Sequence, residues 1–513
     1  MSLNKSKTGY IVAGLLLSIL MASMDNTIVS TAMGTIVGEL GGLDKFVWVV
    51  SAYMVAEMAG MPIFGKLSDM YGRKRFFVFG LIVFIIGPML CGTASSITQL
   101  SIYRAIQGIG GGALIPICFT IILDAVSPEN RGKLMGLFGA VFGMSSIFGP
   151  LLGAYITDYV SWQWIFYINL PLGLLSLLLI LICYKESPVH AKQRIDWLGA
   201  ITLVGAIVCI MFALELGGKI YAWDSVQIIG LFIGFAVLAA AFLFAELRAA
   251  EPIIAFGMFK NRLYSSSSII ALFSGAAFIA ASVYIPIFIQ GVMGGTATNS
   301  GFVLLPMMLG TVVTATGSGM LMNRISYRAL LLSTLAILVT GLLLLATITP
   351  DTSRLMITLY MILTGLGIGE SFSILVNAAT HSIPVNQRGS ANATLNFLRS
   401  LGMALGITIY GILQSHTMTR QLSDAFEANG LDVPAGVDFK DPYALMSSST
   451  RSLIPEQALG VITNGLSSSI SIIFAWGLIP AMVAFIAAWM MGREKHDPKA
   501  EMEAYAAGAH SHG

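Results

Sequence analysis

Long apolar runs alternate with short polar connections along the whole chain. We find fourteen such runs, and their expected spans are 9–31, 46–64, 76–97, 98–124, 133–156, 164–184, 195–217, 225–247, 265–290, 298–322, 328–348, 354–379, 390–413 and 468–491. A helix needs about 20 residues to cross the hydrocarbon core of a bilayer. The runs are long and continuously apolar, which favours helices over the short alternating strands of a barrel. The pattern therefore predicts an all-α membrane protein with fourteen transmembrane helices.

Basic residues are distributed unevenly among the connections. With the N-terminus in the cytoplasm, 20 of the 28 lysines and arginines fall in cytoplasmic segments and 6 in outer segments. Cytoplasmic loops of membrane proteins carry such an excess of positive charge. One helix more or fewer would destroy this alternation, so the count supports fourteen helices and predicts that both termini are cytoplasmic.

The longest connection spans residues 414–467 and falls on the outer side of the membrane. It contains several acidic residues, including Asp424 and Asp438. A small extracellular cap or hairpin fits this segment, and so does a solvated loop.

The composition supports a membrane protein. Apolar residues make up 56% of the chain and charged residues 11%, whereas soluble domains carry about 25% charged residues. The low charge content excludes a soluble enzyme or a nucleic-acid binder, and a net charge of +2 is too small to imply a polyanionic partner. We expect no metal or cofactor, because the cysteines lie inside apolar runs without the spacing of a metal site or disulfide framework: Cys91, Cys118, Cys183 and Cys209.

A pattern of glycines and one arginine recurs 257 residues later in the chain. The matched sets are Gly108, Gly110 and Gly112 with Gly365, Gly367 and Gly369, and Arg131-Gly132 with Arg388-Gly389. A weaker echo relates Gly65–Asp69 to Gly319–Asn323. The repeat predicts two parallel six-helix halves with a site between them near the membrane midplane. We assign the halves to residues 1–190 and 251–513, and the two helices within 191–250 to an insertion.

Six charged side chains fall well inside the predicted helices. They are Asp25, Glu57, Arg104, Glu215, Glu370 and Arg399. Each is a candidate functional residue, because inserting such a group into hydrocarbon costs about 2.5–3.5 kcal/mol. Burial disfavours the charged form of a carboxyl group, so a buried carboxyl can load and release a proton. We therefore expect Asp25, Glu57 and Glu370 to couple protons or substrate to transport.

Three of these residues also fit a purely structural role. Glu215 lies near the outer end of its helix, where its side chain can snorkel to the interface. Arg104 and Arg399 each need a carboxylate or several carbonyl groups, so either arginine also fits a structural ion pair.

Two glycine-rich stretches imitate nucleotide-binding motifs. Gly60–Lys66 resembles a phosphate loop, but Leu67 stands where a Ser or Thr would bind magnesium. Gly108–Ala113 lies inside an apolar helix that no strand precedes. We therefore expect no nucleotide partner, and an ion gradient remains as the energy source. No histidine has partners at a useful catalytic spacing, so we do not expect an enzyme.

Several motifs together resemble those of a known family. Gly65–Arg75 (GKLSDMYGRKR) follows the second predicted helix, and Arg104–Gly110 (RAIQGIG) lies in the fourth. The fifth carries Gly143–Gly153 (GMSSIFGPLLG). Met24–Val29 (MDNTIV) and Trp162–Gly173 (WQWIFYINLPLG) add two more. These motifs resemble the major facilitator superfamily and, within it, the fourteen-helix drug:proton antiporters.

The resemblance implies a fold and a conformational latch. The fold would be two six-helix bundles plus two extra transmembrane helices. Asp69 would hold one half against the other in one access state, within a loop motif that also includes Gly65, Gly72 and Arg73.

The resemblance also implies roles inside the helices. Asp25 matches the acidic residue of the family's first-helix signature, and Arg104 belongs to a motif tied to proton transfer. The fifth helix looks like the motif of exporters, although close packing alone accounts for its small residues equally well: Gly143, Gly149, Pro150 and Gly153. The chain departs from the family pattern at three positions: Gly34, Ala154 and Gln163.

The implied activity is proton-coupled efflux of lipophilic, often cationic drugs by alternating access. The protein would act as a monomer among the lipids of a bacterial cytoplasmic membrane, with no cofactor. An exporter of a single metabolite, lipid or antibiotic such as tetracycline would have the same fold and is the alternative.

Overall fold

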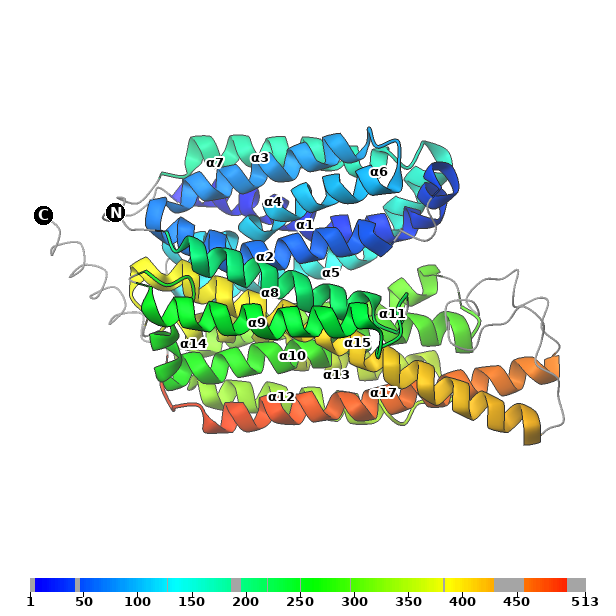
Figure 1. Cartoon of the computed structure of the whole chain (residues 1–513). Helices are drawn as coiled ribbons and strands as arrows, with labels where there is room; N and C mark the ends of the chain where they lie inside the picture. Colours follow the sequence, from blue (N-terminus) through cyan, green and yellow to red (C-terminus); the bar gives the residue numbers. More distant parts are fainter. Residues whose placement is uncertain are drawn as a thin grey trace, which may run out of the picture.

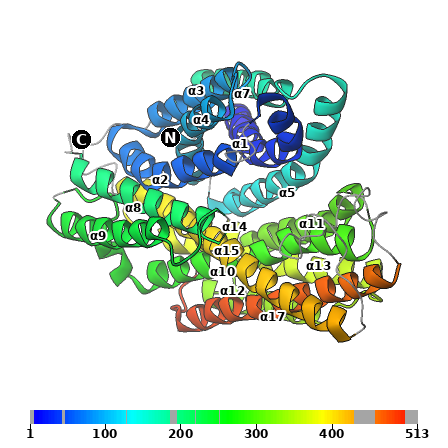
Figure 2. The ribbon, with the colours of Figure 1, turned by 45° about the vertical axis from the view of Figure 1, so that its right-hand side comes forward.

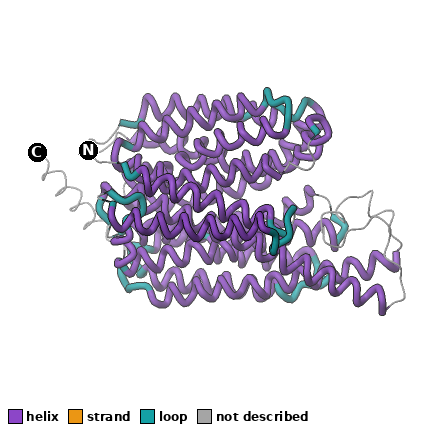
Figure 3. Tube along the Cα trace, viewed as in Figure 1, coloured by secondary structure: helices purple, strands orange, loops and turns teal. Residues whose placement is uncertain are grey.

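The computed structural model describes residues 5–41, 47–126, 128–185, 195–218, 220–249, 251–295, 297–381, 383–428 and 456–495. Nearly all of these residues are helical, and short loops join the helices at the two ends of the molecule (Figure 3). The described residues contain no strand beyond one isolated bridge, between Gly217 and Tyr221.

The N-terminal bundle contains six membrane crossings. Its helices are α1 (Lys5–Leu40), α2 (Val47–Tyr71), α3 (Arg73–Cys91), α4 (Ile97–Ala125), α5 (Pro128–Tyr159), and a last crossing divided into α6 (Trp164–Tyr167) and α7 (Asn169–Cys183). Two further helices follow: α8 (Trp197–Leu216) and α9 (Val226–Arg248).

The C-terminal bundle begins after a short connection that contains η1 (Phe256–Lys260). Its elements are α10 (Arg262–Ile287) with η2 (Phe288–Val292), α11 (Ala297–Leu321), α12 (Tyr327–Leu345), α13 (Arg354–Ile368) with α14 (Glu370–Thr380), η3 (Val385–Gln387), α15 (Arg388–Ala428) and α17 (Glu456–Met490).

The helices agree with the predicted crossings. In the part of the chain that is described, 13 helices are long and apolar enough to span a membrane. The remaining predicted crossing, the fifth at 133–156, corresponds to α5, in which a shorter apolar stretch covers Phe148–Thr157. Glycines and serines dilute the apolar residues of this helix, as its sequence shows.

The predicted connection at 414–467 needs correction. α15 continues to Ala428 and α17 already begins at Glu456, so both flanks of this segment are helical. The two helices extend beyond their neighbours at one end of the molecule (Figure 1). Residues 429–455 lie outside the described part of the chain, as do residues next to the predicted boundaries after 190 and 250.

The two bundles lie side by side, and α8 and α9 lie over one seam between them (Figures 1 and 2). Buried side chains of α8, including Leu203 and Ile207, share an apolar cluster with α2 and α15. The rings of Trp48 on α2 and Phe212 on α8 lie 4.8 Å apart. At the other seam, α5 packs against α11. The inserted pair therefore covers only one of the two lines along which the bundles meet.

Candidate functional site

An ion pair lies at the centre of the N-terminal bundle. Asp25 on α1 and Arg104 on α4 are both fully buried, and Arg104 Nη1 donates to Asp25 Oδ2. Charged groups are buried in proteins when they are paired and hydrogen-bonded, because burying one alone is very costly. Two of the six charges that the sequence places inside helices therefore partner each other.

Two amide side chains complete the surroundings of this carboxylate. Gln107 Nε2 and Asn169 Nδ2 donate to Asp25 Oδ1 at 2.8 and 3.0 Å. Gln107 Oε1 in turn accepts from Arg104 Nη1 at 2.7 Å, and Arg104 Nε donates to the Val49 carbonyl at 3.3 Å. The network joins α1, α2, α4 and α7 through one buried carboxylate.

Glu57 lies next to this network on α2. The Arg104 guanidinium lies 4.3 Å from the centre of the Tyr53 ring, and Tyr53 and Glu57 are one helical turn apart. A Cβ atom at Gly111 would lie 2.9 Å from Tyr53 Oη and 3.6 Å from Glu57 Cγ. A glycine of α4 therefore leaves room for both side chains, and Asp25, Glu57 and Arg104 belong to one cluster.

The glycines of α5 pack directly against the helix that carries Asp25. A Cβ atom at Gly149 would lie 2.9 Å from Thr27 Cβ, and one at Gly153 would lie 2.8 Å from the Ile28 carbonyl oxygen. Thr27 Oγ1 also donates to the Ser145 carbonyl at 3.1 Å. These contacts show close packing between α5 and α1.

The other two members of the α5 motif are Pro150 and Gly143. Pro150 lies inside the helix and is partly exposed, while the surroundings of Gly143 lie outside the described part of the structure.

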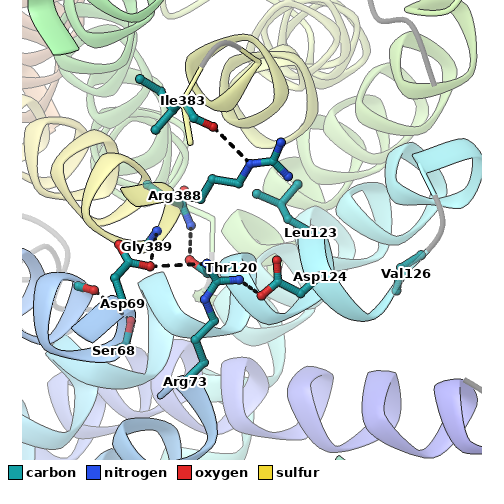
Figure 4. Close-up of polar contacts among 12 residues, drawn as sticks. Ser68, Asp69, Arg73, Thr120, Leu123, Asp124, Val126, Ile383, Arg388 and Gly389 are labelled. Atoms are coloured by element: carbon teal, nitrogen blue, oxygen red, sulfur yellow. Dashed lines mark hydrogen bonds and ion pairs between the residues drawn. The ribbon is translucent and has the colours of Figure 1, made fainter. Parts of the chain in front are cut away.

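A second polar cluster joins the two bundles where α2 ends and α15 begins. Asp69 accepts from the backbone N–H groups of Gly389 and Ser390 at 2.9 and 2.7 Å. Arg73 donates to Asp69 at 3.3 Å and also pairs with Asp124 on α4. Figure 4 shows Asp69 directed at Gly389, with Arg73 between Asp69 and Asp124. The carboxylate thus bridges the bundles while an arginine fixes it to its own half.

Glycine is needed at three positions around this bridge. A Cβ atom at Gly65 would lie 2.9 Å from the Gly389 carbonyl oxygen, and one at Gly389 would lie 2.5 Å from Asp69 Oδ1. Gly72 separates α2 from α3 with φ of 108°, a conformation that strongly favours glycine. The close approach of α2 and α15 therefore depends on these small residues.

The other three charged candidates lie elsewhere. Glu370 is the first residue of α14, and its side chain lies outside the described part of the structure. Arg399 on α15 donates to the Ser371 carbonyl and to Asn396 Oδ1, the latter at 3.3 Å, so it lies beside the start of α14. Glu215 lies near the end of α8 and is partly exposed.

Four residues of these clusters were not singled out from the sequence. Gln107 and Asn169 lie within the quoted motifs, but they are uncharged and escaped a search for buried charge. Tyr53 reads as an ordinary apolar aromatic residue. Asp124 ends a predicted helix, where an acidic residue at a water interface is unremarkable. A search for polar side chains on α4 and α7 would have found the two amides.

The described residues offer no evident metal ligands. Among them, no group of three His, Cys, Asp or Glu side chains could hold a metal ion. The four cysteines are free thiols.

Comparisons with known proteins point to one family. The model of the Major Facilitator Superfamily matches residues 15–407. Multidrug resistance protein 3 of Bacillus subtilis (strain 168) is 53% identical over 500 residues, which cover 97% of this chain and 98% of that protein. The multidrug transporter protein MdtP of the same organism is 36% identical over 420 residues, covering 82% and 78%.

Solved structures share the arrangement of helices. The proton:xylose symporter XylE matches with a TM-score of 0.58 and 14% identity, covering 93% of this chain and 95% of its own. The human organic anion transporter MFSD10 matches with a TM-score of 0.57 and 16% identity, covering 92% and 99%. At such identities the likeness concerns the fold alone.

Proposed function

The chain belongs to the Major Facilitator Superfamily, and we propose that it exports lipophilic, often cationic drugs in exchange for protons. The family match, the relatives and the similar structures confirm the predicted fold of two six-helix bundles with two extra membrane helices. They also confirm a multi-pass membrane transporter of small molecules in place of an enzyme.

Drug export is supported by the relatives. Two of them, 53% and 36% identical, are named as multidrug resistance or multidrug transporter proteins. In this proposal a cationic substrate binds near the polar cluster around Asp25 and Glu57, which lies within a bundle whose helices are mainly apolar.

The buried pair of Asp25 and Arg104 is the observation that carries proton coupling. An ion pair in a low-dielectric interior attracts strongly, and its attraction disappears when the carboxyl group is protonated. A proton that enters from outside would neutralise Asp25, release Arg104 from its partner and lower the affinity for a cation nearby. Glu370, at the break between α13 and α14, is the second coupling group in this proposal, because interrupted helices near the midplane commonly form such sites.

The Asp69 bridge provides the conformational part of the cycle. Because Asp69 bonds to α15, the bundles are held together at the end where the described chain enters α1 and leaves α17 (Figure 1). We place this end and both termini in the cytoplasm of a bacterial cell, with the protein acting as a monomer. Breaking the bridge would then allow the bundles to open toward the cytoplasm and load drug.

Transport in proteoliposomes tests this proposal. Purified protein is reconstituted, a pH gradient is imposed, and the movement of a cationic dye and a panel of unrelated drugs is followed with and without a protonophore. We expect gradient-driven transport that the protonophore abolishes and that Asp25→Asn and Glu370→Gln both reduce. Wild-type rates in both variants would contradict the assignment, and transport of a single panel member would favour the exporter of one cargo.

A further inference from the structure

Asn169 lies at the break in the sixth membrane crossing, beside the carboxyl group of Asp25. α6 ends at Tyr167, α7 begins at Asn169, and the Asn169 side chain is fully buried. Its Nδ2 donates to Asp25 Oδ1 at 3.0 Å. Its Oδ1 is buried and has no hydrogen-bond partner among the residues that the structure describes. Buried acceptors are nearly always paired, so the missing partner of Asn169 Oδ1 needs a physical explanation.

The hydrogen-bond pattern around Asp25 fits only its ionised form. Arg104, Gln107 and Asn169 all donate to the carboxylate oxygens. A protonated carboxyl group carries an O–H that needs an acceptor. A partner that reverses its role when Asp25 takes up a proton would supply that acceptor.

Two of the three partners cannot reverse. The guanidinium of Arg104 has no acceptor atom. Gln107 is fixed at both ends, because its Oε1 accepts from Arg104 at 2.7 Å while its Nε2 donates to Asp25 at 2.8 Å. Turning this amide would direct its NH2 group at the guanidinium. Asn169 alone keeps an unused oxygen, and a half-turn of its amide directs that oxygen at Asp25.

We propose that Asn169 is a positioning residue that serves Asp25 in both protonation states. With Asp25 ionised, Asn169 Nδ2 donates to the carboxylate. When a proton from the outer solution forms an O–H bond at Oδ1, the amide turns and its oxygen accepts that O–H, while Gln107 continues to donate to the same atom. When the proton leaves to the inner solution, the amide turns back. This inference rests on the proposed proton exchange.

Other charged and titratable groups lie near Asp25. The groups that interact electrostatically with Asp25 lie on three helices of the bundle. They are Arg104 on α4, Tyr53 and Glu57 on α2, and Cys91 on α3. In the hydrogen bonds that α5 and α7 make with Ser23, Asp25 and Thr27 of α1, the described partners are Ser145 and the Asn169 amide. Any effect of Asn169 must be separated from these charges, so the test leaves all of them in place.

Two transport rates measured on one preparation test the proposal. Asn169→Leu keeps the branched shape and the number of heavy atoms of the side chain and removes both polar atoms. Drug efflux driven by a pH gradient requires protonation and deprotonation of Asp25, whereas drug–drug exchange at equal pH uses only the drug-bound form. We expect the first rate to fall about 10- to 100-fold, as for the loss of a buried hydrogen bond to a charged group. The second rate should fall by a smaller factor, because exchange at equal pH never requires the protonated form of Asp25.

A matched control removes a buried amide from the other bundle. Asn377 on α14 is buried, and its Nδ2 donates to the Ser373 carbonyl at 2.8 Å. Asn377→Leu should leave the ratio of the two rates unchanged. If Asn169→Leu does not fold, Asn169→Ala replaces it and must show the same divergence. A variant that slows both rates equally, or neither, overturns the inference.

Infrared difference spectra on acidification give a direct readout. The C=O band of protonated Asp25 is identified by its loss in Asp25→Asn, and it should move to higher frequency in Asn169→Leu or Asn169→Ala because the O–H has lost its acceptor. An unmoved band overturns the inference. Failure of the wild-type protein to couple efflux to a pH gradient would instead overturn the proposed function itself.

Discussion

The two bundles share a backbone design and differ in where they place charge. Arg131 Nε donates to the Val126 carbonyl at 3.2 Å, and Arg388 Nε donates to the Ile383 carbonyl at 3.5 Å. In each case the arginine binds the carbonyl five residues earlier, in the turn that precedes its helix. The repeat thus preserves a structural contact at corresponding places in the two halves.

The charged centre of the N-terminal bundle has no such counterpart. The residues 257 positions after Arg104 and Gln107 are Met361 and Thr364, and Met361 is fully buried. Thr364 donates to the Tyr360 carbonyl on its own helix at 2.9 Å. The same backbone arrangement therefore supports a charged network in one half and an apolar core in the other. The repeat determines the arrangement of the helices, and individual residues determine the chemistry of each half.

The bridge between the bundles shows the same asymmetry. Asp69 is buried against α15, whereas its echo Asn323 is exposed at the end of α11. We expect the charged positions to be needed for function and the shared glycines to be needed for packing. Substitutions that copy a residue of one half into the other should therefore distinguish functional from packing effects.

Arg104→Met copies the C-terminal residue into the N-terminal bundle and should have the largest effect. It leaves Asp25 buried without its cation, which costs about 3–5 kcal/mol of unfolding free energy, and it should abolish pH-driven efflux. Thermal unfolding in detergent measures the loss. Met361→Leu, the volume-conserving control at the equivalent position, should cost less than about 1.5 kcal/mol.

A double variant sharpens this first prediction. Asp25→Asn combined with Arg104→Met removes both charges, so it should recover most of the lost stability and remain inactive. Equal stability of Arg104→Met and Met361→Leu would show that the pair contributes nothing special to the N-terminal bundle.

Asp69→Asn copies Asn323 into the bridge and should have the next largest effect. Hydrogen bonds to a charged group contribute about 1.5–3 kcal/mol, so the equilibrium should shift toward opening of this end by about 10- to 100-fold. Distances between spin labels on the two bundles would report the shift. Asn323→Asp, at an exposed position, should leave the distances unchanged; equal responses would remove the asymmetry between the two loops.

Gly149→Ala should have a moderate effect through packing alone. The added Cβ would press α5 away from Thr27, at a cost of about 1–3 kcal/mol. Gly317→Ala on α11 is the control, because no atom lies within 4 Å of the added Cβ, and it should be neutral or stabilising by up to about 1 kcal/mol. Unfolding curves for the pair check this, and equal curves would argue against close packing of α5 on α1.

Glu251→Gln should have the smallest effect. Glu251 lies in the connection to the C-terminal bundle and pairs with Lys66 at 2.8 Å, with side-chain exposures of 34% and 12%. A partly exposed pair contributes less than about 1 kcal/mol. Unfolding should therefore change little, as it should for the control Asp424→Asn, in the exposed pair with Arg420. A loss of several kcal/mol of unfolding free energy would show that this connection helps to hold the two bundles together.

The membrane crossings could be predicted because hydrocarbon imposes a length and an apolar composition on every helix. The extension of α15 past residue 413 could not, since it carries Gln414, Arg420 and Asp424. A helix that leaves the bilayer is free to use polar residues, so the apolar run ends before the helix does.

The charged part of the site could be predicted because burying a charge is costly wherever it occurs. That criterion selected Asp25, Glu57 and Arg104, which the structure brings into one cluster. It says nothing about where a charge lies in the fold, and it selected Glu215 and Arg399 equally. It also missed Gln107 and Asn169, whose amides can be buried at a much lower cost. The positions of these side chains and the directions of their hydrogen bonds depend on how the helices pack, and the structure is needed to see them.

Proton release on drug binding tests the central claim most directly. Drug is added to purified protein in weakly buffered detergent solution at several pH values, and a pH-sensitive dye reports the protons released. The account predicts release from the wild-type protein and a marked loss of that release in Asp25→Asn, in which drug binding is verified separately. The same release from Asp25→Asn as from the wild type would contradict the claim that the Asp25 carboxyl group exchanges its proton for the drug.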